Sequence, residues 1–145
     1  MPGHAKPNGA SRSTPTLAFE QAFWNAGLRA VAGVDEVGRG AMAGPLYAAA
    51  VVFPASEGWP LRRLRSALSG VRDSKLLTSE QRISQLANIE ASATAMAVGY
   101  VSVEEIDAVG LGPANRMAME RAVLSLNVDV DALLIDACVL DLGCP

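Results

Sequence analysis

Histidine and cysteine are nearly absent from this sequence of 145 residues. The one histidine, His4, lies near the N-terminus, and the two cysteines, Cys138 and Cys144, lie near the C-terminus. Such a set fits neither a zinc site nor a disulfide framework, and it removes serine-histidine and cysteine-histidine catalysis. Any chemistry in this chain must therefore depend on carboxylates, with or without a bound metal.

Long apolar runs and an excess of basic residues are also missing. The run LYAAAVVF at residues 46–53 stops at Pro54, whereas a membrane-spanning helix needs roughly 18 apolar residues. Residues 1–15 are rich in Pro, Gly and Ser and lack the apolar segment of a secretory signal, so we expect a disordered leader. We expect a cytoplasmic protein that is a monomer and does not contact a membrane. Because the net charge is −3, only a local basic patch could attract nucleic acid.

The composition is that of a globular protein, and we expect residues 16–145 to form one domain. Half of the residues are hydrophobic and 19% are charged, which favours a single packed core over disorder. Periodicity and turn residues predict the following elements: a helix over 17–27, strands over 29–36 and 45–53, a helix over 78–91, a strand over 93–101, a helix over 102–110, a helix from Pro113, and a strand over 131–137. Residues 54–77 are less regular, with at most a helical turn or two.

This order of elements indicates an α/β fold, a mostly buried sheet covered by helices. A last strand that follows a helical crossover is expected to lie parallel to a neighbouring strand. The first two strands are apolar enough to be buried on both faces. Thr78 with Gln81, and Ser102 with Glu105, have the spacing of helix capping boxes. Ile83 and Leu86 define the apolar face of the helix over 78–91.

Three carboxylates follow apolar strands. Asp35 and Glu36 end the first strand, and Asp136 ends the last. If these strands are parallel neighbours, about 4.8 Å apart, the acids crowd into one site and favour a bound cation. Oxygen ligands without His or Cys suit Mg²⁺ or Mn²⁺, and two such ions would suit phosphoryl displacement. The competing interpretation is structural, because an acid at a strand end is often only a cap or a turn former.

Two further features could meet phosphates. The loop Gly38, Arg39 and Gly40 offers unobstructed backbone N–H groups and a guanidinium, although an ordinary connecting loop has the same composition. A locally basic segment follows later in the chain and contains only one acid, Asp73; its basic residues are Arg62, Arg63, Arg65, Arg72 and Lys75. A charge run of this kind is also consistent with a solvated face.

Together these stretches resemble bacterial ribonuclease HII, the type 2 ribonuclease H. The resemblance runs from about Leu17 to the last residue and is carried by four segments in order: AGVDEVGRGAMAGPLYAAAVVF, DSKLLTSEQR, VEEIDAVGLGPANRMAMERAV and LLIDA. It implies a ribonuclease H-like mixed sheet flanked by helices, whose first three strands are antiparallel and whose first and fourth strands are neighbours. It also implies cleavage of the RNA strand of RNA/DNA hybrids, and nicking of DNA on the 5′ side of embedded ribonucleotides.

The resemblance assigns roles to seven residues. By similarity, Asp35, Glu36 and Asp136 are the catalytic carboxylates that hold Mg²⁺ or Mn²⁺. Gly38, Arg39 and Gly40 match the loop that reads the ribose 2′-hydroxyl, and Lys75 matches a motif near the substrate phosphates.

The chain also departs from the family. Ala137 stands where many members have glycine, and the family continues beyond this point to a fourth carboxylate that Asp141 does not match. We therefore expect either a fragment, truncated at its C-terminus, or a shortened homologue with impaired activity. Two rival functions remain: an inactive homologue that binds hybrid without cleaving it, and a small acidic interaction domain whose carboxylates only cap strands.

Overall fold

A computed structural model describes residues 15–40, 43–136 and 140. The expected leader lies outside these residues except for Pro15, and so do both cysteines, Ala137 and Asp141. Along the described chain the elements are α1 (Ala18–Asn25), β1 (Val31–Val37), β2 (Leu46–Val52), α2 (Gly58–Ala67), a 3₁₀ turn η1 (Ser74–Leu76), α3 (Ser79–Ser92), β3 (Ala95–Val101), α4 (Val103–Val109), α5 (Leu111–Leu124) and β4 (Ala132–Ile135). None of the helices in these ranges is long and apolar enough to cross a membrane.

The described strands form one four-stranded sheet in the order β3-β2-β1-β4. β1, β2 and β3 are antiparallel to their neighbours, whereas β4 pairs with β1 in parallel. The two consecutive helices α4 and α5 make the crossover that a parallel return requires. The predicted α/β mixed sheet is therefore confirmed, including the position of the first and fourth strands side by side.

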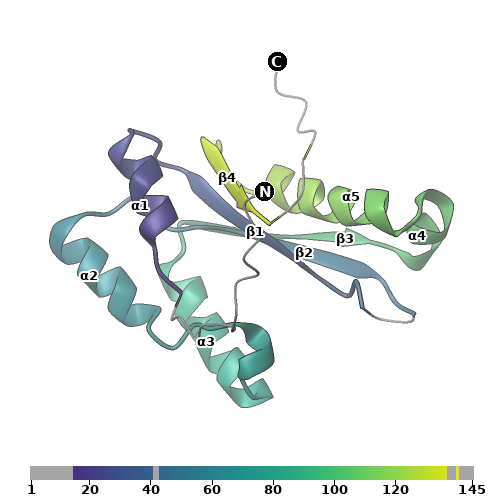
Figure 1. Cartoon of the computed structure of the whole chain (residues 1–145), viewed down its shortest axis with the longest axis horizontal. Helices are drawn as coiled ribbons and strands as arrows, with labels where there is room; N and C mark the ends of the chain where they lie inside the picture. The colour runs from purple at the N-terminus through teal and green to yellow at the C-terminus, as the bar shows by residue number, and fades with distance from the viewer. Residues whose placement is uncertain (1–14, 41–42, 137–139, 141–145) are drawn as a thin grey trace, which may run out of the picture.

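Helix α5 covers one face of the sheet (Figure 1). Its small residues Ala114, Ala118 and Ala122 are fully buried and allow the helix to approach β2 and β3 closely. The approach is closest at Gly99 of β3, where an added Cβ atom would overlap the carbonyl of Ala118 and lie 2.6 Å from the amide nitrogen of Ala122. The largest core cluster lies between α5 and the sheet.

The opposite face is covered only in part. α1, α2 and α3 lie on this side (Figure 1), and a smaller cluster joins α1 and α2 to the sheet through Leu17, Trp24, Val31, Leu61 and Leu64. Beyond this cluster the face is exposed. The expectation that both early strands are buried on two faces is therefore wrong for β2, which alternates between buried and exposed residues, because α5 covers one of its sides and no described element covers the other along most of its length.

The helices α3, α4 and α5 start at or near the residues predicted from the sequence. Both predicted capping boxes are present, at Thr78 before α3 and at Ser102 before α4. α5 begins at Leu111 rather than at the predicted Pro113, which occupies the third helical position. Helix α3 contains no buried residue, and Ile83 on its apolar side is 70% exposed. Its amphipathic pattern predicted the helix correctly, although its apolar face does not pack into the core.

A side-chain network ties α5 to the end of β3. The guanidinium of Arg121 donates two hydrogen bonds to the Glu105 carboxylate, at 2.6 and 3.0 Å, and one to the Tyr100 carbonyl at 2.6 Å. Glu105 in turn accepts the backbone N–H of Ser102 as part of the α4 cap. The hydrogen bonds from Arg121 and Ser102 lower the pKa of Glu105 to about 2. This network fixes the corner at which the chain leaves the sheet and begins its crossover.

Candidate functional site

Strand β1 carries the acid pair on two different faces of the sheet. Ala32 and Val34 belong to the core under α5, whereas Val31 belongs to the cluster on the opposite side. Since successive strand residues alternate between faces, Glu36 follows Val34 to the α5 side and Asp35 lies on the other side. Asp35 is exposed and Glu36 is half-buried.

Strand β4 brings Asp136 to the same edge as Asp35. The parallel register pairs Gly33 with Leu134 and Val34 with Ile135, so the next residues along the two chains are Asp35 and Asp136. The two aspartates, about a hundred positions apart in sequence, thus lie at the carboxyl ends of adjacent parallel strands, as the sequence predicted.

Asp131, which the sequence reasoning did not single out, anchors the start of β1 beside β4. One of its carboxylate oxygens accepts the backbone N–H groups of Arg29 and Ala30, at 2.8 and 2.9 Å. These two hydrogen bonds lower the pKa of Asp131. A further bond joins the Asp131 N–H to the Ala30 carbonyl at 2.8 Å. The register that pairs the two strands is therefore set at their amino ends, and it carries through to the aspartates at the other end.

Asp35 and Glu36 also have local partners. The Asp35 carboxylate accepts the backbone N–H of Glu36 at 2.9 Å. The Glu36 carboxylate lies 3.8 Å from the guanidinium of Arg39, whose side chain is 57% exposed. A partly exposed ion pair at this distance contributes little to stability. Arg39 is thus held near the acids and keeps most of its hydrogen-bonding capacity for another partner.

The donor set suits a hard divalent cation, but its arrangement is incomplete. Carboxylate oxygens are the ligands that Mg²⁺ and Mn²⁺ prefer, and Asp35 and Asp136 lie at the same end of the sheet. Within β1, Asp35 and Glu36 face opposite sides. Among the described residues, no group of three or more His, Cys, Asp or Glu side chains is placed to hold a metal ion. The assignment of all three acids as metal ligands therefore stays a prediction.

Gly38 and Gly40, in the loop after β1, differ in what the backbone requires of them. Gly38 has a φ of +103°, and a Cβ atom there would lie 2.8 Å from the Pro45 carbonyl oxygen, so only glycine fits without strain. A Cβ atom at Gly40 would meet nothing within 4 Å. Gly38 also lines a cavity of about 270 Å³ whose other walls come from β2, α4 and the start of α5. Local backbone geometry explains Gly38, whereas it leaves Gly40 open to a role in contacting a ligand.

The basic segment spans α2, the turn η1 and the stretch between them. All five of its basic side chains are exposed. Lys75 belongs to η1, which Asp73 caps by accepting the Lys75 backbone N–H at 3.0 Å. Arg72 lines a cavity with residues of α3, not the one that Gly38 lines. Two arginines of the segment have local partners: Arg65 donates to the side-chain oxygen of Gln21 at 2.6 Å, and Arg63 lies 5.1 Å from the ring centre of Trp59.

Comparisons with known proteins agree on one family. The family model described as "Ribonuclease HII" matches residues 32–141. Ribonuclease HII of Roseiflexus castenholzii is 46% identical over 129 residues, which cover 89% of this chain and 56% of that protein. Ribonuclease HII of Geobacillus kaustophilus is 41% identical over 129 residues, covering 89% of this chain and 45% of the other. The chain thus spans about half the length of these curated relatives.

A solved structure supports the same grouping. The crystal structure of ribonuclease H2 from Pyrococcus horikoshii matches with a TM-score of 0.64 and 31% sequence identity, over 77% of this chain and 52% of that one. The mixed sheet with its flanking helices is therefore a ribonuclease H-like fold, present over roughly half the length of its relatives.

Proposed function

Because this chain belongs to the ribonuclease HII family, we propose that the protein is a metal-dependent endoribonuclease. Its substrates are RNA/DNA hybrids, in which it cleaves the RNA strand, and DNA with embedded ribonucleotides, which it nicks on the 5′ side of the ribonucleotide. We further propose that residues 16–145 belong to the ribonuclease H-like domain, and that the protein works in the cytoplasm as a monomer.

The observation that carries the proposal is the placement of Asp35 and Asp136 at one edge of the sheet. Asp35 lies near the end of β1, and Asp136 directly follows β4, the parallel neighbour of β1, a position where open α/β sheets bind their ligands. Mg²⁺ or Mn²⁺ held by these carboxylates would activate water and offset the negative charge that develops on the phosphate. Glu36, one residue away, is the third proposed ligand.

The neighbouring loop is suited to hold the strand that is cut. Arg39 is mostly exposed, so its guanidinium can pair with a phosphate. Gly40 carries no side chain that would keep a ribose from the backbone, and a backbone group can hydrogen-bond the 2′-hydroxyl that distinguishes RNA from DNA. Lys75, which is exposed, contributes a positive charge for the substrate phosphates.

The decisive experiment is cleavage of a DNA duplex that bears one ribonucleotide, with Mg²⁺ or Mn²⁺. We expect cleavage by the protein and at least a 100-fold loss in Asp35→Asn, because the substitution removes a charged metal ligand while keeping the side-chain shape. Asp129→Asn, which changes an exposed acid before β4, serves as the matched control and should cleave at the normal rate. Cleavage that is equal in both variants, or that needs no metal, would contradict the proposal.

One observation favours a second candidate, a homologue that binds hybrid without cleaving it. Three carboxylates do not converge in the described part of the chain. Binding of hybrid in preference to plain DNA duplex, with no cleavage at any metal concentration, is the result that supports this candidate. A small acidic interaction domain predicts neither the preference for hybrid nor thermal stabilisation by Mn²⁺.

A further inference from the structure

Helix α2 presents an aromatic and basic face to solvent. Leu61 and Leu64 are its buried residues, so the helix packs against the rest of the fold through one side. Trp59, Arg62 and Arg63 are exposed, and residues spaced by three and four positions lie on the same side of a helix. With 3.6 residues per turn, this side points away from the buried leucines. We call these three residues the outer face of α2.

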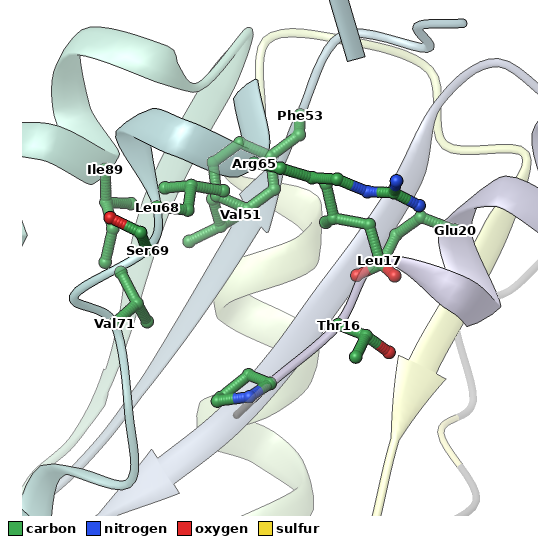
Figure 2. A pocket seen from close by; sticks show the side chains of 11 residues that line it. Thr16, Leu17, Glu20, Val51, Phe53, Arg65, Leu68, Ser69, Val71 and Ile89 are labelled. Carbon is green, nitrogen blue, oxygen red and sulfur yellow. The ribbon is translucent and has the colours of Figure 1, made fainter. Parts of the chain in front are cut away.

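Arg65, the third arginine of the helix, does not belong to the outer face. It lines a cavity of about 460 Å³ together with Glu20 (Figure 2), and it donates a hydrogen bond to the side chain of Gln21 at 2.6 Å. By contrast, neither Arg62 nor Arg63 forms an ion pair or a hydrogen bond with another residue that the structure describes. The charges of the outer face are therefore available to an anionic partner.

An exposed tryptophan beside these charges narrows the kind of partner. Trp59 is 62% exposed, and the guanidinium of Arg63 lies 5.1 Å from the centre of its ring. A cation–π contact of this kind holds the guanidinium near the ring, so a positive charge is positioned next to an aromatic surface that solvent still reaches. A partner that combines a flat aromatic group with negative charge matches both features.

The charge of α2 contrasts with that of the whole chain. The net charge is −3, yet the helix contains three arginines and no acidic residue. The nearest acid in sequence is Glu57, directly before the helix. The outer face therefore attracts an anion locally, although the protein as a whole is acidic.

We propose that the outer face of α2 binds a single-stranded segment of nucleic acid. One base stacks on Trp59, while Arg62 and Arg63 pair with the neighbouring phosphates. From Trp59 to Arg63 the helix rises about 6 Å, which matches roughly two nucleotides at about 3.4 Å per phosphate. The choice of a nucleic acid over another anionic partner rests on the proposed function, in which the substrate is a nucleic acid.

This surface is separate from the proposed cleavage site. Leu61 and Leu64 share a packed cluster with Val31, the first residue of β1. Asp35 lies four residues further along the strand, which is roughly 13 Å at about 3.3 Å per residue. Binding at the outer face thus requires neither metal nor cleavage, and it adds affinity for substrates that carry an unpaired strand.

Tryptophan fluorescence tests the proposal directly. The chain has two tryptophans, and Trp24 is buried, so a stacked base can quench only Trp59. An oligothymidylate of about 12 nucleotides, within the usual site size for single strands, is titrated into the protein in EDTA, which prevents metal-dependent cleavage. We expect saturable quenching that weakens as salt is added. The slope of log K against log [salt] should be about −1.4 for two phosphate contacts.

Two arginine variants provide the matched comparison, after circular dichroism has confirmed that they are folded. Arg62→Gln should weaken binding about threefold or more and bring the slope to about −0.7, because one phosphate contact is lost. Arg116→Gln removes an exposed arginine of α5 instead, and it should leave both the affinity and the slope unchanged.

A third variant tests the stacking. In Trp59→Leu the quenching should disappear, and binding followed by the anisotropy of a labelled oligothymidylate should weaken about fivefold or more. Pairing the oligothymidylate with oligoadenylate should reduce the quenching of the unchanged protein, because the bases of a duplex are stacked on one another. Equal quenching by the duplex would contradict stacking on Trp59.

The proposal is overturned if oligothymidylate does not quench Trp59, or if Arg62→Gln and Arg116→Gln bind it equally well. Polyglutamate is titrated at the same concentration of charge, and equal quenching by this acidic polypeptide would contradict recognition of a nucleic acid. Cleavage is assayed separately with Mg²⁺ or Mn²⁺. Quenching without cleavage contradicts the proposed function and leaves the outer-face contact intact, whereas cleavage without quenching contradicts only that contact.

Discussion

The two faces of the sheet are built in opposite ways. On the α5 side small residues meet, and Gly99 with the alanines of α5 allows backbone atoms to come into contact. On the opposite face, which we call the open face, Tyr47, Val98 and Tyr100 expose large side chains to solvent. Within the described residues, the α5 side is therefore a packed layer, whereas the open face is covered only in part.

The largest expected difference between the faces concerns two strand glycines. Gly99→Ala would force a Cβ atom against the carbonyl of Ala118 on the α5 side, and we expect a loss of about 4 kcal/mol in unfolding free energy or failure to fold. Gly33→Ala in β1 is the matched control, because a Cβ atom there meets nothing within 4 Å. It should change stability by less than about 1 kcal/mol. Urea denaturation of both variants measures the difference, and equal losses would contradict the comparison.

A smaller difference is expected for two valines of β3. Val101→Thr places a hydroxyl in the fully buried core under α5, which should cost about 2 kcal/mol because the group loses its hydrogen bonds to water. Val98→Thr makes the same chemical change on the open face, where water remains available, and should cost less than about 0.5 kcal/mol. Thermal unfolding monitored by circular dichroism gives both values. A cost at Val98 equal to that at Val101 would show that the open face is covered in solution.

The smallest effect concerns pH and the Arg121–Glu105 network. Hydrogen bonds hold the pKa of Glu105 at about 2, below its ordinary value of 4.5, so the unfolded chain binds this proton more tightly than the folded one. The resulting stabilisation is present above about pH 4.5 and is lost as the pH falls towards 2. Glu105→Gln should reduce this acid-dependent loss when stability is measured between pH 6 and pH 2.5.

Asp131 provides a check on that interpretation. Its pKa is also lowered, by the backbone N–H groups of Ala30 and Arg29, so Glu105→Gln should flatten the pH dependence without removing it. Asp131→Asn should flatten it as well, and the double variant should flatten it more than either. If Glu105→Gln leaves the pH profile unchanged, the network does not hold this carboxylate in its charged form.

Local signals in the sequence predicted most of the elements, although the stretch expected to hold a helical turn or two contains the ten-residue helix α2. The residues of each capping box are neighbours in sequence, so Thr78 and Ser102 marked their helix starts correctly. Alternation and β-branched residues located the strands to within a few residues. The helical crossover predicted that β4 would lie parallel to a neighbouring strand, and the resemblance named β1 as that neighbour.

What the sequence did not predict depends on long-range packing. One side of β2 and the apolar side of α3 are exposed. A local sequence pattern predicts an apolar side, but it does not predict whether another element of the fold covers that side. The assignment of Asp35 and Glu36 as joint metal ligands came from the resemblance and stays a prediction, since adjacent residues of a strand face opposite sides of the sheet. Asp131 was missed because its partners, Arg29 and Ala30, are about a hundred residues away.

The hydrogen bonds of Asp131 also have a consequence for how the molecule folds. They close a loop that contains almost the entire described chain, with residue separations of 101 and 102. Closing a loop of that length costs chain entropy before any contact is gained, which makes it a late and slow step. The hairpin of β1 and β2 and the pairing of α4 with α5 involve only local contacts and can form first. Asp35 and Asp136 are therefore brought to the same end of the sheet only when β4 pairs with β1.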